Sequence, residues 1–139
     1  MLSIMGLEKF RNNKIKLFCL FVFSITVLFL AGCDSDKKIE VVQGGTFTAY
    51  PNVPIGKAFD SYFKDGTWNT VKEGDFEYTV YKGNYTKDNQ EFEIEIYFKL
   101  EGEDKTTFEF AFIKLDDSKI SIWDAKRIID TAMRTYKGK

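Results

Sequence analysis

Apolar and polar positions divide the chain into an apolar N-terminal run and a longer region of alternating and helical patterns. The run covers residues 17–30 and follows a basic segment at residues 9–16. A basic segment followed by ~7–15 apolar residues is typical of a secretory signal peptide, whereas a membrane-spanning helix needs about 20 apolar residues. The pattern therefore predicts that residues 1–32 are a cleaved signal peptide. The alternative is an uncleaved signal anchor.

The clearest alternation of apolar and polar side chains lies at residues 91–100. It predicts a strand with one face toward the core. Residues 75–81 and 106–115 alternate in a similar way, and turn-forming residues at 87–90 and 101–105 separate the three segments. We therefore expect a three-stranded antiparallel meander. Its predicted core face carries Phe76, Tyr78, Val80, Phe92, Ile94, Ile96, Phe98, Leu100, Phe108, Phe110 and Phe112.

Apolar positions at helical spacing mark two further segments, residues 54–64 and residues 121–136. Pro54 suits the first position of a helix, because its missing N–H would be unpaired there anyway. Ser121, with Asp124 three residues later, resembles a capping box. With both helices covering the Phe/Ile face, the predicted fold is α+β: a two-layer sandwich in the order helix, three-stranded antiparallel meander, helix.

The region between the apolar run and the first helix has a weaker pattern. Residues 33–41 are rich in charge, so we expect a mobile tether there. Residues 42–139 then make a single domain, as their length indicates. Trp68, just after the first helix, is expected to fold back onto the core.

Charge narrows the range of partners. Residues 1–32 contain four of the 20 basic side chains and one of the 21 acidic ones, so residues 33–139 keep 16 and 20, a net charge of −4. A mildly acidic domain without a basic block argues against nucleic acid as a partner and against electrostatic attraction to anionic lipid.

The end of the apolar run, Leu30-Ala31-Gly32-Cys33, resembles a bacterial lipobox. The resemblance implies a diacylglycerol on the Cys33 thiol, cleavage between Gly32 and Cys33, and acylation of the new N-terminus with a fatty acid such as palmitate. Two or three acyl chains anchor a protein stably, since each buried methylene contributes ~0.8 kcal/mol. Cys19 leaves with the signal peptide and Cys33 is acylated, so no disulfide is expected.

A second resemblance begins at residues 50–63. Ile55-Gly56-Lys57-Ala58-Phe59-Asp60, followed by Trp68, is similar to the opening of a small α+β domain of uncharacterised bacterial secreted and lipid-anchored proteins. Pro54 stands here where that family usually has Thr. The family brings no assigned activity. A looser similarity, to BamE-type and β-lactamase-inhibitor-like domains, implies binding of proteins through an open sheet face.

The side chains exclude most catalytic chemistry. The chain has no histidine, and residues 34–139 have no cysteine, which removes the usual thiol nucleophiles, imidazole bases and zinc ligands. The carboxylates of Glu91, Glu93 and Glu95 recur about 7 Å apart along one strand face, which suits the wet side of a sheet better than a glycosidase pair. We expect no enzyme, no cofactor and no metal site.

The predicted outer face of the sheet is the candidate contact surface. If Phe76, Tyr78 and Val80 face the helices, other side chains gather on the opposite face, with aromatic and aliphatic groups beside carboxylates. They are Tyr81, Tyr97, Ala111, Ile113, Glu93 and Glu95. The alternative is that residues 41–50 or Trp68 cover this patch.

These observations predict a non-enzymatic binding or interaction module, lipid-anchored at Cys33 on the extracytoplasmic face of a bacterial cell membrane, either periplasmic or at the cell surface. Its partner would be an envelope or extracellular protein. The alternatives are a structural subunit of envelope assembly, a phage-exclusion or immunity lipoprotein, and a carboxylate-dependent hydrolase.

Overall fold

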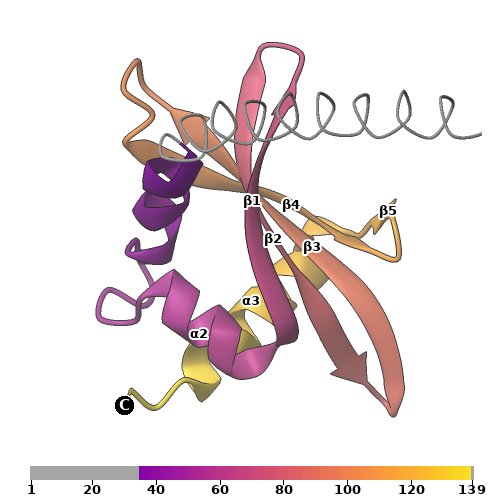
Figure 1. The fold of residues 1–139 in the computed structure, drawn as a ribbon. Helices are drawn as coiled ribbons and strands as arrows, with labels where there is room; N and C mark the ends of the chain where they lie inside the picture. The colour runs from indigo at the N-terminus through magenta and orange to yellow at the C-terminus, as the bar shows by residue number, and fades with distance from the viewer. Residues whose placement is uncertain (1–34, 139) are drawn as a thin grey trace, which may run out of the picture. The chain divides into compact units, whose positions relative to one another are not determined.

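The computed structural model describes residues 35–138, so the predicted signal peptide and Cys33 lie outside the described residues. Five strands form one antiparallel sheet in the order β1-β2-β3-β4-β5 (Figure 1). The elements are a helix over residues 35–43, α2 (Ile55–Tyr62), β1 (Lys64–Glu73), β2 (Phe76–Lys87), β3 (Gln90–Glu101), β4 (Thr107–Leu115), β5 (Ser118–Lys119) and α3 (Ile122–Thr135). The α+β class is confirmed, but the meander is longer than the predicted three strands. No helix in this part of the chain is long and apolar enough to cross a membrane.

Residues 35–43 are helical, and we call them the N-terminal helix; the tether expected up to residue 41 is not what this segment forms. Lys38 makes an ion pair of 2.5 Å with Glu77 in β2, and its carbonyl oxygen accepts a hydrogen bond from the Thr79 hydroxyl. Val42 is fully buried in the core. The prediction of a tether relied on the high charge of this segment. Charged side chains on one side of a short helix are compatible with an apolar contact on the other side.

Strand β1 was not predicted, and it places Trp68 opposite Tyr81 of β2. The indole lies parallel to the Phe59 ring of α2, with 6.2 Å between centroids. Gly66 also lies within β1, and a Cβ there would be 2.6 Å from Cζ of Tyr81. Most other side chains of this edge strand are polar and exposed, which is common at sheet edges and weakens the strand pattern.

The faces of β2 are opposite to those predicted. Tyr81 pairs with Ile96 and is fully buried on the face that α2 and α3 cover, whereas Tyr78 and Val80 lie on the other face. The Tyr81 hydroxyl donates to the carbonyl oxygen of Phe59 at 3.3 Å. Both faces of this strand carry aromatic side chains, so alternation alone could not decide which face is buried.

The prediction for β4 was wrong about Phe112, because a β-bulge at Ala111 interrupts the regular alternation of the strand. Tyr97 pairs with Phe112 while the next residue of β3, Phe98, pairs with Phe110. Ala111 is therefore an extra residue, and the side chains before and after it follow different alternations. Phe110 lies on the helix-covered face, and Phe112 lies on the face opposite α2 and α3, which we call the outer face.

The ends of the elements follow local chemistry. Pro54 is the N-cap of α2 and precedes its first helical residue, whereas the sequence predicted Pro54 at the first helical position itself. The Ser121 hydroxyl accepts a hydrogen bond from the Asp124 backbone N–H at 3.1 Å, which confirms the predicted cap of α3. The turn predicted at residues 87–90 is confirmed, with Asp88 and Asn89 at positive φ, as a two-residue hairpin loop requires.

Candidate functional site

The residues of the predicted contact surface do not lie together. Tyr81 and Ile113 are fully buried on the helix-covered face, so the sequence prediction placed both on the wrong side of the sheet. Tyr97, Glu93 and Glu95 do share the outer face. Ala111 sits at the bulge and is partly buried.

The aromatic side chains of the outer face pack mainly against one another. The Tyr97 and Phe112 rings stack with centroids 4.4 Å apart, and Tyr78 meets both edge-on. The ammonium of Lys119 lies 4.0 Å from the Phe112 centroid, and that of Lys114 lies 5.2 Å from the Tyr97 centroid. Tyr97 is only 5% exposed. The Tyr97 ring is therefore covered by its neighbours.

The carboxylates of the outer face are engaged by neighbours. Glu93 forms an ion pair of 3.2 Å with Lys82, and Glu95 accepts a hydrogen bond of 2.7 Å from the Tyr97 hydroxyl. Burial and this hydrogen bond raise the pKa of Tyr97. Carboxylate oxygens of Glu93, Glu95 and Asp117 lie within 4.8 Å of one another. Such acidic groups at a hairpin end are common on solvated surfaces.

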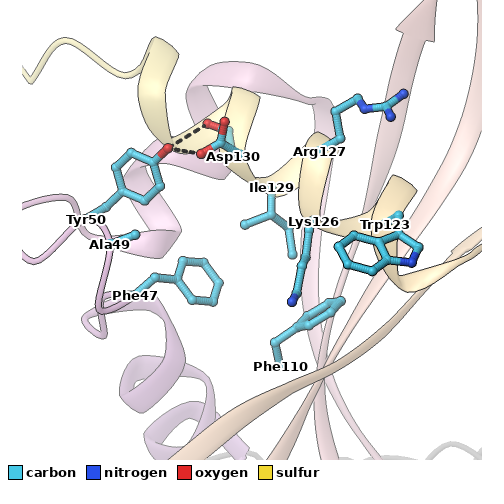
Figure 2. Close-up of a pocket in the computed structure, with 9 residues that line it drawn as sticks. All are labelled: Phe47, Ala49, Tyr50, Phe110, Trp123, Lys126, Arg127, Ile129 and Asp130. Atoms are coloured by element: carbon cyan, nitrogen blue, oxygen red, sulfur yellow. Dashed lines mark hydrogen bonds between the residues drawn. The ribbon is translucent and has the colours of Figure 1, made fainter.

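A different surface has the shape of a binding site. Between α3, strand β4 and the loop after the N-terminal helix lies a groove of about 620 Å³, which we call the α3 groove (Figure 2). This volume falls in the usual range for ligand sites, ~300–1,000 Å³. The lining residues are Phe47, Ala49, Tyr50, Phe110, Trp123, Lys126, Arg127, Ile129 and Asp130.

The position of each apolar side chain in the groove follows from the fold. Phe110 enters from β4 because its pairing with Phe98 of β3 places it on the helix-covered face. Phe47 packs against Phe98, with 6.2 Å between centroids. Trp123 lies in the first turn of α3 and is 74% exposed, the highest value among the large hydrophobic side chains of residues 35–138. The groove thus combines an apolar floor with a projecting aromatic side chain.

One wall of the groove is closed by a polar contact. The Tyr50 hydroxyl donates a hydrogen bond to the Asp130 carboxylate, and this bond raises the pKa of Tyr50 (Figure 2). Asp130 also lies 3.7 Å from the guanidinium of Arg134. The contact ties the loop to α3 through Asp130, the one carboxylate among the described residues that line the groove.

Positive charge remains at the rim of the groove. Lys126 extends across the groove toward Phe110, while Arg127 points outward (Figure 2). The Lys126 ammonium lies 5.7 Å from the Trp123 ring centroid, and Arg127 lies 3.9 Å from Asp124 in an exposed pair. Exposed pairs of this kind contribute little, ~0–1 kcal/mol. Lys126 and Arg127 therefore present cations beside an apolar surface, in a domain that is acidic as a whole.

Sequence reasoning did not find the α3 groove, although one signal was present. The apolar stripe of α3 accounts for its buried residues, and Trp123 lies outside that stripe, one turn before the exposed Lys126 and Arg127. A large aromatic side chain on the polar side of an amphipathic helix indicates a contact surface. The loop residues Phe47 and Tyr50 carry no comparable signal.

The sequence and the structure were compared with known proteins. No protein-family model, no curated protein and no solved structure matches this chain. The lipobox and the family resemblance drawn from the residues stay predictions.

Proposed function

We propose that this chain is a lipid-anchored, extracytoplasmic binding module without enzymatic activity, and that it contacts a protein partner through the α3 groove. The observation that carries the proposal is Trp123, 74% exposed at the edge of an apolar groove of about 620 Å³. Tryptophan and arginine are enriched among residues that dominate binding energy, and such residues cluster where an apolar side chain meets a pocket.

The lining of the groove supports binding rather than catalysis. The described residues that line it include no Ser or Cys nucleophile, and their one carboxylate, Asp130, accepts a hydrogen bond from the Tyr50 hydroxyl. A general base must reach a substrate proton, and the Tyr50 hydroxyl already takes one acceptor position of this carboxylate. The floor and wall are aromatic and aliphatic, which suits contact with an apolar side chain of a partner.

The start of the domain fits an anchor at Cys33. The N-terminal helix includes Ser35, whose hydroxyl accepts a hydrogen bond from the Thr70 hydroxyl of β1 at 3.1 Å. Two residues can span at most ~7 Å, so an acylated Cys33 would hold the β1 side of the sheet close to the membrane. The α3 groove lies at the β4 side, which leaves it accessible to a partner.

Photo-crosslinking in cells tests the proposal. The lipidated chain would carry a photoreactive residue at position 123 or, as the matched control, at position 78 on the outer face. We expect one dominant adduct from position 123, identified by mass spectrometry, and only background from position 78. The proposal fails if position 78 gives the dominant adduct or if position 123 gives none.

A strain that lacks the protein distinguishes two possible roles, envelope assembly and exclusion or immunity. An envelope-assembly subunit should cause an envelope defect whenever it is absent, whereas an exclusion or immunity protein should matter only under challenge. Sensitivity of the deletion strain to detergent, measured without phage, separates the two.

A further inference from the structure

One edge of the sheet is free next to the α3 groove. Strand β4 pairs along its length with β3, but on its other side it pairs with β5 only at Lys114 and Leu115. Among the described residues, the backbone of Thr107–Phe110 has no strand partner on that side. Unpaired N–H and C=O groups along an edge are a ready template for another extended segment.

Two grooves follow this edge and share residues. The second groove, of about 470 Å³, lies between residues 41–48 and β4, and both grooves are lined by Phe47 and Phe110. Together they are lined along the β4 side by residues 106–110 and reach Trp123 at the start of α3. An elongated surface of this kind fits an extended chain better than a compact ligand.

We propose that the partner binds as an extended polypeptide segment that adds to the sheet at Thr107–Phe110 of β4, with apolar side chains in the two grooves and an acidic side chain at Lys126 and Arg127. This inference rests on the proposed function and specifies how the groove is used. Backbone pairing would supply affinity, and the grooves would select alternate side chains of the segment.

The faces on which the β4 side chains lie determine the sequence pattern expected of the partner segment. Phe108 and Phe110 lie on the helix-covered face, whereas Thr107 and Glu109 lie on the outer face. Every second side chain of an added strand would lie next to the two phenylalanines and enter the grooves. We therefore expect apolar residues at alternate positions of the partner segment.

Charge complementarity distinguishes this partner from a second copy of the chain. If two β4 edges paired antiparallel over Thr107–Phe110, the Glu109 side chains of both copies would lie on one face close to each other, and like charges near each other destabilise strand pairing. Lys126 and Arg127 favour an acidic partner instead. The bulge at Ala111 and strand β5 limit the added strand to a short stretch.

Selection from a displayed library of short random peptides tests the inference, with the mature lipidated chain in lipid nanodiscs as the target. We expect the selected peptides to alternate apolar residues, to carry a neighbouring Asp or Glu, and to protect the amides of Thr107–Phe110 from hydrogen exchange. A synthetic peptide methylated at its pairing backbone nitrogens should bind at least about tenfold more weakly, because its side chains are unchanged but it cannot pair.

Charge reversal provides the matched control. Lys126→Glu with Arg127→Glu should lower the affinity for the selected peptide by about tenfold. Lys99→Glu on the outer face should change that affinity less than twofold. If the methylated peptide binds equally well and Trp123→Ala still abolishes binding, edge pairing is wrong while the proposed function stands.

Three other outcomes overturn the inference. If no selected peptide depends on Trp123, the proposed function fails as well. Quenching of Trp123 fluorescence by laurate, without any peptide binding, identifies a small amphiphile as the occupant. A concentration-dependent doubling of mass identifies a second copy of the chain.

Discussion

The rings of Tyr97 and Phe112 stack on the outer face with centroids 4.4 Å apart, yet Phe110, two residues earlier in β4, packs against Phe98 on the opposite face. In a regular strand, residues two positions apart share a face. The extra residue Ala111 resolves this difference. The bulge therefore gives β4 one phenylalanine for the outer cluster and leaves another for the α3 groove.

Deletion of Ala111 should be tolerated. A deletion within a strand normally moves the side chains on one side of it to the other face, but removal of the bulge residue leaves Phe110 and Phe112 on their present faces. We expect the free energy of unfolding to change by no more than about 1 kcal/mol. Deletion of Glu109, the matched control, should cost at least about 2 kcal/mol, because one phenylalanine leaves the helix-covered face. Equal urea midpoints for the two deletions would contradict the bulge.

The N-terminal helix should contribute to stability. Val42 is fully buried, so Val42→Ala should lower the free energy of unfolding by about 2 kcal/mol through lost apolar burial and the cavity left behind. Asp36→Ala, at an exposed position of the same helix, should change it by less than about 0.5 kcal/mol. Urea denaturation of the mature chain measures both. A flexible tether would instead make the two variants equally neutral.

The fold was predictable where one feature decided the structure. Every second position of β3 from Phe92 to Leu100 is apolar, and Ser121 with Asp124 marks the start of α3, so both elements were found. Tyr81 was misplaced because a tyrosine ring suits either face until its hydroxyl finds a partner, here the Phe59 carbonyl. The bulge at Ala111 has no local sequence signal, because it depends on the register with β3.

The same limits apply to the candidate site. Trp123 could have been identified from its position on the polar side of α3. The other half of the groove comes from Phe47 and Tyr50, which reach α3 only because the N-terminal helix packs on the sheet and the Tyr50 hydroxyl meets Asp130. Contacts between residues 80 positions apart in the sequence cannot be read from a local pattern.

Stability should fall at alkaline pH. Burial raises the pKa of Tyr81 to about 12, from an ordinary value of 10.0. The folded state therefore keeps a proton that the unfolded state releases, so the stabilisation is complete below about pH 10 and is lost as the pH rises toward 12. Tyr97, whose pKa burial also raises, acts in the same direction. Tyr81→Phe should show a shallower decline of the urea midpoint across this range; an unchanged slope would show that Tyr81 does not titrate there.

Maturation should depend on Cys33. Cys33→Ser should accumulate as the full-length precursor, because the proposed acylation needs the thiol. Cys19→Ser should mature normally, since that residue belongs to the segment that is removed. The intact mass of the protein, together with incorporation of labelled palmitate, reports both. A Cys33→Ser chain of mature length would refute the lipobox.

The central claim is that the α3 groove, and not the outer face of the sheet, is the binding surface. The most direct test is the affinity of the protein captured from position 123, measured with purified components for Trp123→Ala and for Tyr78→Ala. We predict a loss of at least about tenfold for Trp123→Ala, as for a residue that dominates an interface, and less than twofold for Tyr78→Ala. The reverse order would contradict the account and return the binding site to the outer face.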